Sequence, residues 1–582
     1  MTGHRVYCGC KRSISLRHVI MRFSHVAAAI LLCCLCSGRQ NSPSAIGSNN
    51  PPEAAKPGAA NSEPTPVFHV DTRLVIVDVV AIAHDGQPVR GLQRDSFQLL
   101  EDGKPQQLQV FEEHLPAVQP ARLPEIKLPA DEYTNFPKQV NSSAVNIVLF
   151  DILNTPMSDQ LYARAQMIDF LKTLPRGQRT ALFTLGSDLH MMAGFTTSTD
   201  ELLAAANHVV PNASAYLDTD ADRAAVDRQI QMATQGLSPS QSGTDRGGPR
   251  SFGQMMQEFA TEVEQVRVDD RAQRTFEGLG QLARAVSGYP GRKNLLWLSE
   301  AFPSGILPSR GDSTHFTRSY LGLMQKYSGF LAASQISVYP IDIRGLSASS
   351  SRSMTASQAT MDEIAHQTGG EAFYNTNDLK GALKRGIEHG STYYTLAYIP
   401  ENKNWNGKLR RIDVKVNRSG LTLNYRRGYY ATRDDPTLVE AAHRTFVAEM
   451  QAGVPESTML LLRARVLPPD DKNPMVRVDC AVFAPDISFS GDDRLHHAKL
   501  EWVAIAWDRN SHAAANTSET MELDLQPETY ATIQKTGISA HQELNLPPGT
   551  YRLRLGVMDY STSKIGTLEI PLRVGNTAIA TK

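Results

Sequence analysis

Apolar and polar positions follow a strand-like pattern in the first ordered part of the chain. Residues 74–82, 97–101 and 108–111 are rich in β-branched and other apolar side chains, with turns at 84–88 and 102–104 between them. This pattern predicts a short β-meander. A β-unit of only about 45 residues rarely buries enough surface to be stable alone, so we expect these strands to have partners elsewhere in the chain.

Between residues 140 and 390 the pattern changes to nearly continuous apolar runs separated by helical stretches. The runs are typical of parallel strands covered on both faces, and they occupy residues 145–150, 180–185, 294–299, 336–342 and, more briefly, 371–374. Helices are expected over residues 158–174, from Thr199-Asp200-Glu201 onward, and over residues 279–286, 320–335 and 361–368. In the first of these helices Leu161, Ala165, Ile168, Phe170 and Leu171 recur at helical spacing. The alternation predicts an α/β fold with a doubly wound, mostly parallel sheet of Rossmann type.

One polar segment interrupts this α/β pattern. Residues 211–274 contain few large apolar side chains and a cluster of Gly, Ser and Gln around residues 236–253. We interpret the segment as a partly helical insertion with a mobile tip.

Strand-like patterns return after the α/β segment. Residues 393–398, 410–416 and 421–425 again make less than a domain, so the economical arrangement joins residues 67–115 and 391–431 in one Ig-like β-sandwich with the α/β domain inserted. Two separate β-appendages are the alternative. A helix over residues 438–450 then leads to a C-terminal all-β region, residues 455–576, whose seven expected strands match a second Ig-like sandwich.

The N-terminus has the pattern of an export signal. Residues 1–38 include a basic start at Met21, an apolar run over residues 26–36 and small residues at 37 and 38, so Met21 is a candidate initiator. A run of about 11 residues is too short for a membrane-spanning helix. Residues 39–66 are polar and predict a disordered linker. We therefore expect a secreted, periplasmic or cell-envelope protein without a transmembrane span after signal removal.

Cysteine positions leave a second possibility for the N-terminus. Cys34 or Cys36 could carry a lipid, although the preceding Cys33 and Leu35 do not suit a bacterial lipobox. Outside the first 36 residues the chain has only Cys480, so the mature chain has no internal disulfide.

Charge and motif content exclude several classes of function. Lys and Arg number 59 against 60 Asp and Glu, a net charge of −1, which disfavours a nucleic-acid or anionic-membrane partner. The chain has no His-Glu-x-x-His, P-loop, Gly-x-Ser-x-Gly or Gly-x-Gly-x-x-Gly motif. The pair His496-His497 lacks a second ligand cluster. The run Tyr425-Arg426-Arg427-Gly428-Tyr429-Tyr430 fits either an anionic polymer or cross-strand packing of Arg on Tyr.

Several short motifs, in order, resemble one family. They include Asp85-Gly86-Gln87-Pro88-Val89, Glu101-Asp102-Gly103-Lys104, Phe150-Asp151-Ile152-Leu153-Asn154-Thr155, Leu174-Pro175-Arg176-Gly177, Pro290-Gly291-Arg292-Lys293-Asn294-Leu295 and Arg427-Gly428-Tyr429-Tyr430. Over residues 68–430 the chain resembles the secreted VWFA-related Acidobacterial domain proteins, which contain a von Willebrand factor A-type (VWA) domain. The resemblance implies a VWA-like α/β domain and does not imply a known ligand.

VWA domains typically hold Mg²⁺ in a metal-ion-dependent adhesion site (MIDAS), and the resemblance maps this site only in part. Asp151 matches the first Asp of the Asp-x-Ser-x-Ser loop, Leu153 replaces the first Ser, Thr155 replaces the second, and Glu300 stands for the later Asp. Thr244 and Thr275 are candidates for the second-loop Thr. The missing hydroxyl and the longer acid predict a degenerate site, because Mg²⁺ demands near-ideal octahedral oxygen ligands. Alternatively, Asp151 and Asn154 brace the loop after the strand.

These observations favour a non-enzymatic, exported protein-binding or adhesion module. Its partner would be a protein of unknown identity, contacted at the strand ends near Asn154 and Ser299, with Mg²⁺ held by Asp151, Thr155 and Glu300 if the site binds metal. One alternative is a hydrolase that uses Asp151 and Glu300 as paired acids. The other is a structural envelope component without metal.

Overall fold

The structure of the protein is a computed structural model. It describes residues 74–116, 128–137, 144–212, 252–302, 321–346, 352–431 and 439–575 apart from positions 130, 176, 301, 471, 472 and 493, together with isolated positions between 214 and 232. The expected signal peptide, the linker, most of the Gly/Ser/Gln-rich tip and Thr244 lie outside the described residues. No described helix has the length and apolar character needed to cross a membrane.

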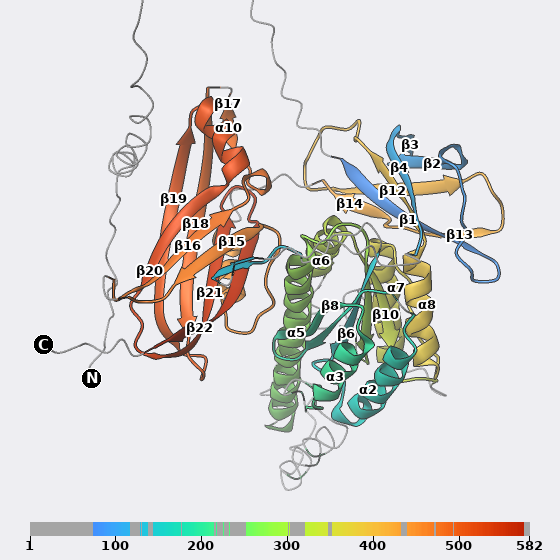
Figure 1. Ribbon diagram of the computed structural model, residues 1–582. Coiled ribbons are helices and arrows are strands. Elements are labelled where there is room, and N and C mark those ends of the chain that lie inside the picture. Colours follow the sequence, from blue (N-terminus) through green and yellow to red (C-terminus); the bar gives the residue numbers. More distant parts are fainter. Residues whose placement is uncertain are drawn as a thin grey trace, which may run out of the picture. The chain divides into compact units, whose positions relative to one another are not determined.

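A five-stranded sheet forms the centre of the α/β region (Figure 1). Its strands, in spatial order, are β10 (Ile336–Asp342), β9 (Lys293–Ser299), β6 (Val145–Asp151), β7 (Thr180–Leu185) and β8 (Leu189–Thr196). The first four are parallel to one another and buried along their whole length, as their apolar runs predict, whereas β8 is antiparallel to β7. The apolar pattern does not predict β8, and it predicts a strand at residues 371–374, where the structure has an isolated parallel bridge between Phe373 and Ile341.

Helices cover both faces of this sheet because successive side chains of a strand point to opposite faces. Ile147 and Leu149 of β6 pack with α5, α6 and α7, whereas Val148 and Phe150 pack with α2, α3 and α8. The bounds are α2 (Met157–Lys172), α3 (Thr199–His208), α5 (Phe252–Val286), α6 (Leu321–Ala333), α7 (Arg352–Thr368) and α8 (Leu379–Ser391). Helix α5 begins within residues 211–274, the segment expected to be a polar insertion, and continues past the end of that segment.

The buried face of α2 differs from the sequence expectation, whereas α3 begins at Thr199 as expected. The buried residues of α2 are Gln160, Ala163, Met167, Phe170 and Leu171, whereas Leu161 is 59% exposed and Ala165 is also exposed. The N-cap of α3 is Ser198, which accepts a hydrogen bond from the backbone N–H of Glu201 at 3.3 Å. Thr199 is thus the first helical residue.

Strands that precede and follow the α/β region share two four-stranded sheets. One sheet has the order β13 (Leu421–Asn424), β1 (Val75–Ala83), β11 (Tyr393–Tyr398), β4 (Leu108–His114). The other has the order β14 (Gly428–Tyr430), β12 (Leu409–Val416), β2 (Phe97–Glu101), β3 (Lys104–Pro105), and a 3₁₀ turn at Arg94–Ser96 precedes β2. In the first sheet Val77 lies opposite Leu396. One hydrophobic core contains residues of both sheets.

The C-terminal region contains two further sheets around one core. The first has the order β20 (Ile538–Leu544), β16 (Val476–Val482), β15 (Leu462–Leu467), β5 (Glu132–Thr134). The second has the order β17 (Ser490–Asp492), β18 (Leu495–Trp507), β21 (Gly549–Asp559), β22 (Ile565–Val574), with β19 (Ala513–Leu525) also paired to β18. Helices α9 (Val439–Glu449) and α10 (Pro527–Thr536) and a 3₁₀ turn at Ala484–Asp486 complete the region. The sequence pattern predicts neither β5, which comes from the Pro-rich connector, nor α10.

Candidate functional site

Asp151 lies at the carboxyl end of β6, the edge of a doubly wound sheet where ligands usually bind. The parallel register pairs Phe150 with Leu298, so Ser299, the last residue of β9, lies beside Asp151. The sheet geometry therefore gathers the Asp151 loop and the end of β9, which are far apart in the sequence.

The Asp151 carboxylate accepts four hydrogen bonds. Its Oδ2 accepts from Trp297 Nε1 at 3.0 Å, Ser299 Oγ at 2.9 Å and Asn154 Nδ2 at 2.8 Å, and its Oδ1 accepts from the Asn154 backbone N–H at 3.0 Å. Asp151 and its three donor residues are all fully buried. Burial raises the pKa of Asp151, and the hydrogen bonds from Asn154, Trp297 and Ser299 oppose that rise.

Helix α5 contributes Thr275 to this cluster. Its hydroxyl accepts a hydrogen bond from Asn154 Nδ2 at 2.9 Å and donates one to the Arg271 carbonyl at 2.8 Å. Thr275 was one of the two candidates for the second-loop Thr, and the structure brings it to Asn154. The Trp297 ring is also fixed from its other side by an edge-on contact with Phe302 at 4.6 Å between centroids.

Glu300 follows β9 and interacts with an acid that the sequence did not single out. The pKa of Glu300 is raised to about 8. Burial is the largest cause, and a hydrogen bond with Asp159 of α2 and the negative charge of Asp159 add to it. Burial and the neighbouring Asp159 thus both favour the protonated form of the Glu300 carboxyl. Nearby, Asp342 at the end of β10 forms an ion pair with Arg344 at 2.6 Å.

The proposed ligands Asp151, Thr155 and Glu300 do not fit a Mg²⁺ ion in this arrangement. The Asp151 oxygens already accept four hydrogen bonds, and the position of the first MIDAS Ser holds Leu153, which is 2% exposed and packed in the core. Thr155 Oγ1 and Glu300 Oε2 are buried and have no hydrogen-bond partner among the described residues, but they alone offer too few oxygens for an octahedral ion. The described residues contain no group of three or more His, Cys, Asp or Glu side chains placed to hold a metal.

The two residues expected to contact a ligand have a different role in the structure. Asn154 and Ser299 are fully buried, and both donate hydrogen bonds to Asp151. They brace the loop after β6. This arrangement agrees with the alternative to metal binding, in which Asp151 and Asn154 brace that loop. A ligand at the strand ends would have to contact residues outside this buried cluster.

Exposed apolar side chains lie on the segments that follow β6 and β10, and the apolar pattern of the sequence does not reveal them. Met157 and Leu161 on α2 are 52% and 59% exposed, Tyr162 is 42% exposed, and Leu346 after β10 is 66% exposed. Asn377 connects the two segments, because its carbonyl accepts from Tyr162 OH at 3.3 Å and its side chain accepts from the Leu346 N–H at 2.8 Å. We call Met157, Leu161, Tyr162 and Leu346 the strand-end apolar patch. The helical spacing of apolar residues in a sequence does not show which of these residues remain exposed to solvent in the fold.

The histidine pair also has partners within the C-terminal region. His497 Nδ1 lies 2.5 Å from Asp524, and His496 stacks on Tyr530 with centroids 3.9 Å apart. This arrangement places the pair in cross-strand and ring contacts on β18.

Comparisons with known proteins complete the description of the site. No protein-family profile matches the chain, and no curated protein matches its sequence. Matching solved structures include an aerotolerance-related membrane protein from Bacteroides fragilis, at 14% identity over 42% of this chain and 98% of that chain with a TM-score of 0.21. BatB from Bacteroides thetaiotaomicron gives 14% identity over 42% of this chain and 97% of that chain, also with a TM-score of 0.21.

Proximal thread matrix protein 1 from the mussel byssus, in a structure with a zinc-occupied MIDAS motif, matches at 10% identity with a TM-score of 0.23. That match covers 46% of this chain and 50% of the mussel protein, so the chain spans about half the length of that protein.

Proposed function

We propose that this chain is an exported, non-enzymatic protein-interaction module with a VWA-like α/β domain and a degenerate MIDAS. In this proposal the α/β domain is inserted in an Ig-like β-sandwich, and a second Ig-like sandwich follows. The strand order supports the VWA-like assignment. Strands are added on one side of β6 up to β8 and then on its other side from β9, so the order reverses between β6 and β9, and the sheet ends in the antiparallel strand β8. The pairing of β1 with β11 and of β2 with β12 supports the insertion.

The strand-end apolar patch is the observation that carries the functional proposal. Four large apolar or aromatic side chains stay 42–66% exposed at the edge of the sheet where doubly wound folds bind ligands. Grouped exposed apolar side chains are typical of protein-interaction surfaces. The hydrogen bonds from Asn154 to Asp151 brace the loop after β6, which leads directly into helix α2 and its patch residues.

The buried carboxylate argues against the hydrolase alternative. A paired-acid mechanism needs two carboxyl groups that reach a substrate. Asp151 is fully buried, with three hydrogen bonds to Oδ2 and one to Oδ1, so a substrate does not reach its carboxylate in this conformation. The apolar patch therefore supports binding better than catalysis.

Site-specific photo-crosslinking tests the proposal. A photoreactive phenylalanine analogue replaces Leu161 or Leu346 in the full chain, and envelope proteins of the source cells are analysed for covalent adducts. The control position is Lys172, which lies at the other end of α2 and is 57% exposed by its side chain. We expect the same partner at both patch positions and no adduct at Lys172. Adducts absent from the patch, or equal at Lys172, would contradict the proposal and favour a purely structural component.

Titration calorimetry with Mg²⁺ tests the degenerate metal site separately. Because the Asp151 oxygens are occupied by hydrogen bonds, we expect no saturable heat from the full chain and no change in its thermal unfolding. Saturable binding that Asp151→Asn removes would show that the strand ends rearrange around a metal ion. Crosslinking in the presence of EDTA then asks whether the partner needs that ion.

A further inference from the structure

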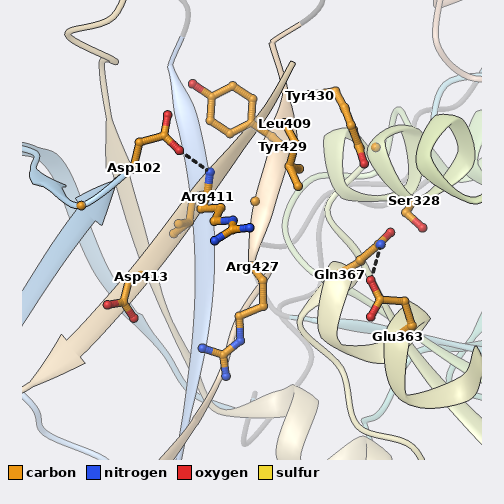
Figure 2. A pocket seen from close by; sticks show the side chains of 14 residues that line it. Asp102, Ser328, Glu363, Gln367, Leu409, Arg411, Asp413, Arg427, Tyr429 and Tyr430 are labelled. Atoms are coloured by element: carbon orange, nitrogen blue, oxygen red, sulfur yellow. Dashed lines mark hydrogen bonds between the residues drawn. The ribbon is translucent and has the colours of Figure 1, made fainter. Parts of the chain in front are cut away.

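An open cavity of about 760 Å³ is lined by none of the residues of the strand-end apolar patch. Strands β12 and β14 form one wall, and helices α6 and α7 form the other (Figure 2). Figure 2 shows Arg411 and Arg427 on the strand side and Glu363 and Gln367 on the helix side. Part of the Tyr- and Arg-rich run at residues 425–430 therefore lines a cavity, which is a role that cross-strand packing alone does not explain.

The acidic groups of the cavity already accept hydrogen bonds from the protein. Asp102 accepts from the Arg411 backbone N–H at 2.9 Å, and Asp413 accepts from Tyr425 OH at 3.1 Å. On the helix side, Glu363 accepts from Gln367 Nε2 at 2.6 Å. These carboxylates are therefore partly satisfied without a ligand.

Hydrogen-bonding capacity remains on the cationic groups and on one amide. In the part of the chain that the structure describes, no hydrogen bond or ion pair involves the Arg411 guanidinium. Arg427 donates to Tyr425 OH and stacks on that ring at 4.2 Å, which uses one of its five N–H groups. Gln367 Oε1 is buried and has no hydrogen-bond partner among the described residues. A complementary ligand thus carries an anionic group for the arginines, whereas Gln367 Oε1 is too deeply buried to bond a ligand.

Strand β14 adds a backbone edge to these groups. It is the terminal strand of its sheet and pairs only with β12, so one side of its backbone has no neighbouring strand in that sheet. Gly428, Tyr429 and Tyr430 line the cavity along this strand. An extended peptide can add to such an edge through main-chain hydrogen bonds, and side chains at alternate positions then face the same way.

We propose that this cavity binds an extended acidic peptide segment of a partner protein as an added strand on β14, with carboxylates at alternate positions paired to Arg411 and Arg427. Arginine favours this role because its planar guanidinium bonds a carboxylate through two parallel N–H groups. Three residues of β14 span about 10 Å, so about three residues of the peptide pair with the edge. The site is separate from the strand-end apolar patch and does not depend on the proposed function.

Fluorescence anisotropy with the full chain tests this site. The probe is a labelled seven-residue peptide in which Glu alternates with Val, compared with the same peptide carrying Lys in place of Glu. We expect saturable binding of the Glu peptide only, and a loss of at least about tenfold in affinity for Arg411→Glu and for Arg427→Glu. Lys415→Glu is the matched control, because Lys415 is exposed on the same strand β12 and does not line the cavity. Thermal unfolding of each variant checks that it folds.

A second peptide separates strand addition from simple charge attraction. It keeps the Glu side chains but carries N-methyl groups on alternate Val residues, which removes main-chain donors. We expect it not to bind. Equal binding of the N-methylated peptide, unchanged binding by Arg411→Glu, or a sulfated polysaccharide that binds more tightly with the same Arg411 dependence would overturn the proposal. Failure of crosslinking at Leu161 or Leu346 would leave this result unaffected.

Discussion

Trp297 Nε1 donates a hydrogen bond to Asp151 Oδ2 across 3.0 Å, from one central strand to the end of its parallel neighbour. Both residues are fully buried. A buried carboxylate in an apolar sheet is costly unless hydrogen bonds stabilise its charge. The indole is thus part of the structure that keeps Asp151 at the strand ends.

Removing this indole donor should destabilise the α/β domain. We expect Trp297→Phe to lower the free energy of unfolding by about 2 kcal/mol, since it removes a hydrogen bond to a carboxylate and leaves a small void. Asp151→Ala should cost more, about 3 kcal/mol or above, because Trp297, Ser299 and Asn154 all lose an acceptor. Urea denaturation measures both. Unchanged stability of Asp151→Ala would contradict the bracing role.

Lys293 should make stability depend on alkaline pH. It is 1% exposed, its Nζ donates to the Ser334 carbonyl at 2.9 Å, and burial lowers its pKa from 10.5 to about 8. Between these values the unfolded chain binds more protons than the folded chain, so stability rises with pH from about 8 to about 10.5 through this group. The full effect corresponds to about 3 kcal/mol.

Comparison with Lys293→Met isolates that dependence from tyrosine ionisation. The variant should lack the rise between pH 8 and 10.5 in chemical denaturation, whereas Lys384→Met, which changes an exposed lysine, should retain it. Identical pH profiles for Lys293→Met and the natural chain would show that Lys293 is not desolvated as described.

The Glu101–Arg410 pair tests whether the split β-strands form one folding unit. Glu101 of β2 accepts from Arg410 at 3.2 Å, from Tyr398 OH at 2.7 Å and from Tyr429 OH at 2.9 Å, and both charges are buried. We expect Arg410→Met to cost about 3–5 kcal/mol, since it leaves the Glu101 charge without its cation. Lys415→Met on the same strand should have little effect. Thermal unfolding followed by circular dichroism measures the difference.

Arg554 should be equally sensitive in the C-terminal region. Its buried guanidinium donates to the carbonyls of Glu449, Val454 and Pro455, which belong to α9 and the segment after it. Arg554→Met removes donors from three carbonyls, and Arg554→Lys keeps the charge without the planar fork. We expect both to lower stability by more than about 2 kcal/mol, whereas Arg573→Met, at an exposed position, should not. Limited proteolysis around α9 gives a second readout.

Several parts of the fold follow from the sequence because local patterns specify them. The continuous apolar runs of β6, β7, β9 and β10 predict strands buried on both faces, and all four are buried in the structure. The short strand β5 and the edge strand β8 escaped prediction. Strand β5 is only three residues long, lies within a Pro-rich connector and is stabilised by its pairing with β15. In edge strands such as β5 and β8, only alternate positions need be apolar, so the sequence shows no continuous apolar run there.

The site depended more strongly on tertiary structure. The sequence by itself placed Asp151, Ser299 and Glu300 at strand ends, because the end of an apolar run is a local signal. Only the folded chain decided that Trp297, Ser299 and Asn154 all donate to Asp151 and that Leu161 remains in solvent. Burial and hydrogen-bond partners depend on which segments pack together, and residues more than a hundred positions apart meet here through the register of parallel strands.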